Sequence, residues 1–163
     1  MKTYIGTKVV RMFPMTRQEY NDLRKWTLPA NENGNDAGYL VEYTDGGEAN
    51  VPGYAGYVSW SPKEQADRAY REVSGINFGM AMEAVKKGYA VARKGWNGVD
   101  LFVYYVPAGK YPAHTGIAKA HFGSDALVPY NSYLAIKTSN NTVSPWAPSA
   151  NDSVADDWFI VLK

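Results

Sequence analysis

Six consecutive residues, Arg93 to Gly98, combine groups that could bind a phosphorylated ligand. Arg93 and Lys94 are cations that could hold phosphate, and Trp96 offers a flat apolar ring on which a nucleotide base could stack. Asn97 adds an amide, and the glycines allow the backbone angles of a tight turn. Because a turn between strands does not require a large aromatic ring beside fixed positive charge, this segment is a candidate binding site.

A second group of polar and aromatic residues follows later in the chain. Trp146 stands in Pro-Trp-Ala, a turn-like context from which its ring can project. Lys137 ends a predicted strand, while Ser149 and Asp152 place short polar side chains in a loop. Either tryptophan alone is also typical of a structural role, Trp96 pinning a hairpin and Trp146 filling a strand. Only the combined set favours binding of a small phosphorylated ligand.

Metal-ligating residues with suitable spacing are not evident in the sequence. His114 and His121 are seven positions apart, which is not the i, i+4 spacing of a helical zinc pair, and Asp125 is the only acid close to them. We therefore predict no metal site.

Catalytic motifs are also missing. The sequence has no GxSxG elbow, Walker loop or dinucleotide-binding GxGxxG after a strand. Asp152, Asp156 and Asp157 could serve as paired carboxylates in glycoside or phosphodiester hydrolysis. A capping role for Asp152 in the turn "SANDSVADDW", with its neighbours solvated, is the simpler interpretation. We predict no catalytic residue and no cofactor.

The composition limits the possible partners. The 163 residues are 45% hydrophobic and carry a formal net charge of +1, so the chain can form a core but has no overall field to hold DNA, RNA or an anionic membrane. It has no cysteine and no apolar run long enough for a signal peptide or membrane span, which fits the cytoplasm. Aromatic residues reach 14%, so some rings are expected to face a ligand or a subunit partner.

The first part of the chain, residues 1–72, predicts a small β-α-β-β-α module. "TRQE" from Thr16 and "SPKE" from Ser61 each pair a hydroxyl N-cap with Glu three residues later, so each should begin a helix, the second with Pro62 at its first position. "YLVEY" and "GYVSW" alternate like the strands of a hairpin.

The second part, residues 75–163, predicts an antiparallel sheet packed by one short helix, which gives an α+β fold overall. Asn77 is a suitable N-cap for "FGMAMEAVKK", whose apolar positions form one stripe, and Gly88 should close this helix. Short turns between strands favour antiparallel pairing, and segment 108–129, rich in breakers, is expected to be a long loop. The expected strands are 89–93, 101–106, 133–137, 142–146 and 158–162.

Three blocks of this second part, taken together, resemble a known family. They are "INFGMAMEAVKKGYAVARKGWNG", "LFVYYVPAG" and "YLAIKTSNNTVSPWAPSANDSVADDWFIV", in that order. They are similar to the second family of phage proteins that counter the bacterial Thoeris defence. The resemblance covers roughly the second half of the chain. It leaves residues 1–72 without an implied role.

The resemblance implies a non-enzymatic protein that sequesters a signal in the host bacterial cytoplasm. Members of that family assemble as homotetramers and bind glycocyclic ADP-ribose made by TIR-domain enzymes, and some also bind cyclic dinucleotides at separate sites. By this resemblance Trp96 and Trp146 would stack on the adenine or shape its pocket. The other implied ligand-binding residues are Asn77, Phe78, Arg93, Asn97, Lys137, Thr138, Ser149 and Asp152. The ligand is expected to be held between subunits, and segment 108–129 to influence which ligand binds.

Two other functions remain open at this stage. An enzyme that cleaves a nucleotide signal could use the aspartates or the two histidines. A phage structural or protein-interaction module could use the same aromatic residues as a protein interface.

Overall fold

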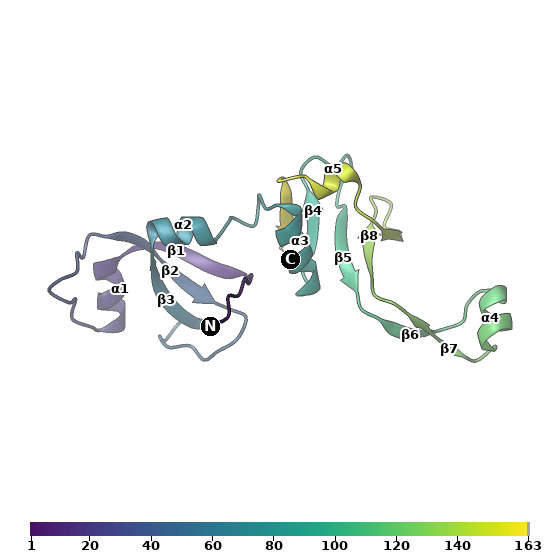
Figure 1. Ribbon diagram of the computed structural model, residues 1–163, viewed down its shortest axis with the longest axis horizontal. Helices are drawn as coiled ribbons and strands as arrows, with labels where there is room; N and C mark the ends of the chain where they lie inside the picture. Colours follow the sequence, from purple (N-terminus) through teal and green to yellow (C-terminus); the bar gives the residue numbers. More distant parts are fainter. Residues whose placement is uncertain (163) are drawn as a thin grey trace. The chain divides into compact units, whose positions relative to one another are not determined.

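The computed structural model describes residues 1–162 and divides into two compact units, Met1–Arg71 and a second from Glu72 onward (Figure 1). Both combine short helices with antiparallel sheets, so the predicted α+β fold class is confirmed. Within the described residues, no helix is long and apolar enough to cross a membrane.

The first unit has the predicted β-α-β-β-α order. Its elements are β1 (Val10–Thr16), α1 (Arg17–Arg24), β2 (Ala37–Tyr43), β3 (Tyr57–Pro62) and α2 (Lys63–Ala69). The strands form an antiparallel sheet in the order β1-β2-β3. Tyr20 of α1 packs with Leu40 and Val58 of the sheet and with Val51 of the connection between β2 and β3, forming this unit's core.

The two predicted helix starts of this unit have different outcomes. Thr16 caps α1 as predicted, and its hydroxyl accepts from the Glu19 backbone N–H at 3.3 Å while the Glu19 carboxylate accepts from the Thr16 N–H at 2.6 Å. The prediction for Ser61 is wrong. Ser61 pairs with Tyr39 as part of β3, so it stays extended, and Pro62 becomes the N-cap without a side-chain hydrogen bond.

The second unit is built on a five-stranded antiparallel sheet, as predicted. Its order is β10-β4-β5-β8-β9, formed by β4 (Ala90–Arg93), β5 (Phe102–Val106), β8 (Tyr133–Lys137), β9 (Val143–Trp146) and β10 (Trp158–Val161). Helix α3 (Phe78–Lys86) packs on β4, β5 and β10. Asn77 caps it by accepting from the Met80 N–H at 3.0 Å, and Gly88 follows it with φ +92°, so both predictions are confirmed.

One face of this sheet forms the core with α3. Val91, Val103 and Ile160 share that face by register and are at most 6% exposed. Trp158 of β10 lies on the same face and is fully buried, and Phe78 at the start of α3 packs against its ring at 5.7 Å between centroids. The indole of Trp158 therefore anchors the helix to the sheet.

Segment 108–129 is not the loop that was predicted. It forms a two-stranded ribbon, β6 (Gly109–Pro112) with β7 (Leu127–Tyr130), ended by α4 (Gly116–Phe122). The ribbon continues the β5–β8 hairpin away from the sheet, and we call it the arm (Figure 1). The prolines that suggested a loop are tolerated because neither strand has a second neighbour in this ribbon.

Replacing Thr16 by alanine should lower the free energy of unfolding of the first unit by about 1 kcal/mol, because the first turn of α1 loses its capping box. Urea titration with circular dichroism measures this change. Gln65→Ala on the exposed side of α2 serves as the control and should change stability little. An equal loss in both variants would contradict a stabilising cap.

Candidate functional site

Three tryptophan side chains of the second unit meet on the core face of the sheet, and we call them the indole cluster. Trp96 lies 5.3 Å from Trp158 and 6.1 Å from Trp146 between ring centroids, and Trp146 lies 6.1 Å from Trp158. All three pairs are edge-to-face, the arrangement that aromatic rings prefer. Trp158 is buried, whereas Trp96 and Trp146 are only half-buried and present apolar surface outward.

The cluster requires a curved sheet. Trp146 and Trp158 come from β9 and β10, the two edge strands, which four strand spacings would separate by about 19 Å in a flat sheet. Their rings nevertheless meet, so the sheet curls toward the face that carries them. The side chain of Trp96 extends from the turn after β4 and contacts both of these rings.

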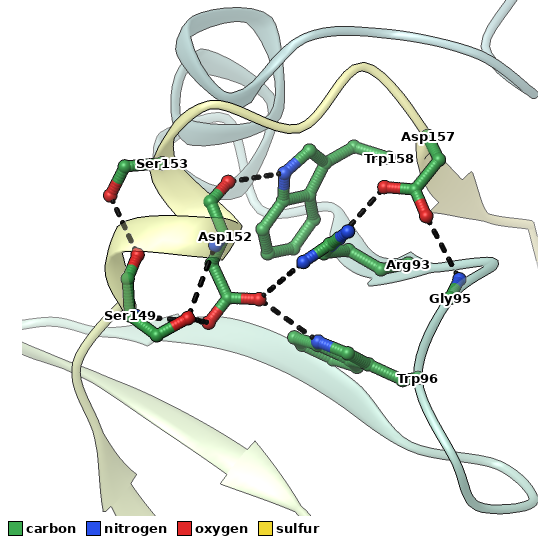
Figure 2. Close-up of polar contacts among 8 residues, drawn as sticks. All are labelled: Arg93, Gly95, Trp96, Ser149, Asp152, Ser153, Asp157 and Trp158. Atoms are coloured by element: carbon green, nitrogen blue, oxygen red, sulfur yellow. Dashed lines mark hydrogen bonds and ion pairs between the residues drawn. The ribbon is translucent and has the colours of Figure 1, made fainter.

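An arginine that bonds to two aspartates lies beside the indole cluster. We call Arg93, Asp152 and Asp157 the Arg93 clamp. The Arg93 Nη1 donates to Asp152 Oδ1 at 2.8 Å and its Nε donates to Asp157 Oδ1 at 2.7 Å (Figure 2). Trp158 pairs with Arg93 across β10 and β4, so the guanidinium lies beside the cluster. The clamp therefore joins β4 to α5 (Ala150–Ser153) and to the residue directly before β10.

Asp152 binds two of the indoles. Its Oδ1 accepts from Trp96 Nε1 at 3.1 Å, and its backbone carbonyl accepts from Trp158 Nε1 at 3.0 Å (Figure 2). Its Oδ2 accepts from the Ser149 N–H at 2.9 Å and from the Ser149 hydroxyl at 2.7 Å. The Ser149 hydroxyl oxygen accepts in turn from the Asp152 N–H at 3.1 Å, and the two bonds from backbone N–H groups form the capping box of α5. The capping role considered for Asp152 is thus present, together with a link to Trp96.

Both aspartates of the clamp are held ionised. Burial by itself would raise the pKa of Asp152, but hydrogen bonds from Arg93, Ser149 and Trp96 outweigh it and keep that pKa well below its usual range. The pKa of Asp157 is lowered mainly by its hydrogen bond with the Arg93 guanidinium. Partial burial acts in the opposite direction, and the hydrogen bond from the Gly95 N–H lowers the pKa further. Such carboxylates are poor general acids near neutral pH.

The turn that carries Trp96 is shaped by Asp157. Its Oδ2 accepts from the Gly95 N–H at 2.9 Å, and a Cβ at Gly95 would lie only 3.0 Å from that oxygen. Glycine therefore lets the backbone approach the carboxylate. The hydrogen bond from Gly95 fixes the turn directly before Trp96. Asn97, next in the turn, is exposed.

Most of the predicted site residues come together around the indole cluster. The clamp includes Arg93 and Asp152, Ser149 caps the adjacent helix, and Phe78 packs on Trp158 directly after Asn77. The Asn77 side chain is used as the cap of α3.

Lys137 and Thr138 are not gathered into this group. Lys137 shares a register row with Phe102 and Val143, on the sheet face opposite to Trp146, where it lines a cleft of about 600 Å³. Its Nζ donates to the Asp100 carbonyl at 3.1 Å. The Thr138 hydroxyl lies 2.7 Å from the Thr142 hydroxyl in the β8–β9 turn.

Two residues that hold the site together were not among the predicted binding residues. Trp158 was assigned only to a strand, and Asp157 only to a possible acidic pair. The signal for Trp158 was its alternation with Ile160, which places both on the core face of β10. Within the described residues, no group of three or more His, Cys, Asp or Glu is placed to hold a metal ion.

Comparisons with known proteins agree with the resemblance seen in the sequence. Residues 76–161 match the Tad2-like family, described as the Thoeris anti-defense 2-like domain. The protein "Thoeris anti-defense 2" of Bacillus phage SP01 is 31% identical over 86 residues, which cover 53% of this chain and 94% of that protein. The matched region contains the indole cluster and the Arg93 clamp.

The clamp should make stability depend on pH at the acid end. Because the native pKa values of Asp152 and Asp157 are lowered, the unfolded chain takes up protons first as pH falls below about 4. The stability contributed by these carboxylates is therefore complete above that pH and is lost below it. Urea titrations between pH 7 and pH 2 measure this loss.

Asp157→Asn should flatten this acid dependence, since one of the two ionised partners of Arg93 is removed. Asp125→Asn, which changes an exposed carboxylate of the arm, is the matched control and should keep the wild-type profile. Identical profiles for Asp157→Asn and wild type would contradict the assigned role of the clamp.

Proposed function

Because this chain belongs to the Tad2-like, Thoeris anti-defense 2-like family, we propose that it binds and sequesters a cyclic nucleotide immune signal of the glycocyclic ADP-ribose type without cleaving it. Acting in the host cytoplasm, it would thereby block Thoeris defence. The observation that carries this proposal is the indole cluster, in which the half-buried rings of Trp96 and Trp146 are held in place, Trp96 by a hydrogen bond to Asp152 and both by packing on Trp158.

The geometry of the cluster favours stacking on its outer surface. A base sandwiched between Trp96 and Trp146 would need parallel rings about 7 Å apart, since apolar atoms pack at about 3.5 Å. The two rings are 6.1 Å apart and inclined by 65°. The adenine would therefore lie against the outer face of one indole and the edge of the other, which contributes about 1 to 3 kcal/mol per stacked base.

Tight sequestration requires more than stacking. Nanomolar affinity corresponds to about −12 kcal/mol, so charged contacts to phosphate and enclosure of the ligand must supply the difference. Arg93 already lies between two carboxylates, and Lys137 lies on the opposite sheet face. Lys94, exposed between Arg93 and the turn that carries Trp96, can offer its charge to phosphate. A cation supplied by a second copy of the chain would add to it in a pocket shared between subunits.

The arm supports self-association as well. Several of its apolar side chains are exposed, among them Ile117 at 80% and Leu127 at 57%. A two-stranded ribbon is marginally stable in water, so contact with another copy would stabilise it. An assembly of four copies, as the resemblance implies, is therefore part of the proposal.

One of the two other functions considered from the sequence, the hydrolase, is less consistent with this geometry. Asp152 and Asp157 both accept hydrogen bonds from Arg93, and both have lowered pKa values. Carboxylates held in this way are unsuited to act as the acid and base pair of a hydrolase. A protein-interaction module would use the same indoles. A ligand-binding experiment distinguishes that function from sequestration of a signal.

Sequestration without cleavage predicts that bound ligand can be recovered. After incubation with glycocyclic ADP-ribose, heat denaturation of the protein should release the intact molecule, as chromatography and mass spectrometry of the supernatant would detect. A converted product would instead support catalysis. The variant with Trp96→Ala and Trp146→Ala should retain little ligand through filtration, because both stacking surfaces are lost.

Trp26→Ala is the matched control for that variant. Trp26 is a tryptophan of the first unit that is 53% exposed, so its removal should leave ligand retention unchanged. If the wild-type protein retains no cyclic ADP-ribose isomer, while the double variant loses only its self-association, the interface function is the correct one.

Self-association through the arm predicts that charge at its apolar positions will dissociate the assembly. Ile117→Asp with Leu127→Asp should reduce the mass measured by native mass spectrometry from that of a tetramer to a smaller species. Ile5→Asp, at an exposed apolar position of the first unit, is the control and should leave the mass unchanged. An intact tetramer in the arm variant would exclude the arm as the interface.

A further inference from the structure

The polar contacts around α5 separate residues that can touch a ligand from residues that hold others in place. Asp152 was predicted from the sequence as a ligand contact. An ionised carboxylate has about four acceptor sites on its two oxygens. Four protein hydrogen bonds occupy them, from Arg93 and Trp96 on Oδ1 and from the Ser149 N–H and hydroxyl on Oδ2.

A saturated carboxylate has no remaining capacity for a ribose hydroxyl. We propose that Asp152 is a positioning residue, whose Oδ1 fixes the Trp96 indole in the orientation that the ligand meets. This inference rests on the proposed function where it concerns the ligand. The orientation of the ring itself can be tested without any ligand.

The hydrogen bond from Trp96 Nε1 is the means by which Asp152 acts. An indole has only one donor, and here that donor points into the protein at 3.1 Å from Oδ1. The edge of the ring that carries nitrogen is therefore held against α5, while Trp146 and Trp158 contact the ring from other sides. Rotation of the indole would break this bond and leave a carboxylate lone pair unsatisfied.

Arg93 acts one step behind Asp152. Its Nη1 donates to the same oxygen that accepts from Trp96, and its Nε is held by Asp157. The side chain of Arg93 is only 16% exposed, and that of Asp152 only 11%, so solvent screens this pair weakly. Arg93 thus keeps Asp152 ionised and aimed at Trp96, and its charge is already balanced by two carboxylates.

The orientation of Trp96 has a spectroscopic signature. Indoles at centroid distances of 5.3 to 6.1 Å couple their electronic transitions, which gives an exciton couplet in far-ultraviolet circular dichroism. Asp152→Ala should weaken this couplet, while Asp152→Asn should largely restore it because the amide oxygen can still accept from Trp96. Ser153→Ala, on the exposed side of the same helix, is the control and should leave the couplet unchanged.

A double-mutant cycle with glycocyclic ADP-ribose tests the link to binding. Asp152→Ala should weaken calorimetric affinity about tenfold in the wild-type background, which corresponds to the loss of about 1.4 kcal/mol. In a Trp96→Phe background, where the N–H donor is already absent, the same change should alter affinity less than twofold. Non-additivity of this size is the mark of one residue acting through another.

The outcomes distinguish the two proposals. If Asp152→Ala weakens binding equally in both backgrounds, Asp152 contacts the ligand directly and the positioning role is wrong. If the couplet is unchanged in an Asp152→Ala protein that remains folded, the positioning role is also wrong. If Asp152→Ala does not fold, Asp152→Asn, which keeps an oxygen acceptor for Trp96, should preserve both the couplet and the affinity, and a loss of affinity with an unchanged couplet in that variant contradicts the positioning role. Failure of the wild-type protein to bind the ligand contradicts the proposed function alone, since the couplet still decides the positioning role.

Discussion

The second unit depends on the placement of one guanidinium between two carboxylates. Arg93 joins the end of β4 to Asp152 in α5 and to Asp157 before β10, segments that are about 60 residues apart in the chain. These pairs are part-buried, so removing one partner leaves a charge that is neither balanced by the protein nor fully screened by solvent. The curled sheet, the short helix α5 and the turn that carries Trp96 therefore all depend on the same charges.

The clamp also explains why polar residues surround an aromatic cluster. An edge-to-face contact adds only about 0.5 to 1.5 kcal/mol to a pair of rings, so three rings in contact could pack in more than one way. Two of the three N–H groups are bound by Asp152, one through its side chain and one through its backbone. Hydrogen bonds thus select one arrangement of the rings, in which Trp96 and Trp146 stay only half-buried beside fixed polar groups.

Local signals predicted much of the fold. The caps at Thr16 and Asn77 and the alternation of the strands were sufficient, because each involves neighbours in sequence. The N-cap predicted at Ser61 is wrong because pairing with Tyr39 keeps this residue in a strand. The prolines of segment 108–129 predict a loop, but the ribbon of the arm tolerates them because neither of its strands has an outer neighbour. The sequence predicts which kinds of residue form the site. It does not predict the partners of Arg93, because they are about 60 residues away in the chain and are brought close only by the fold.

The most direct test of the central claim is a crystal structure of the protein with glycocyclic ADP-ribose. We expect the intact ligand with its adenine on the outer face of Trp96 or Trp146, a phosphate on a cation of a neighbouring copy, and the Asp152 carboxylate still bound to Trp96 Nε1. Ligand density far from the indole cluster, or a cleaved product within it, would contradict the account.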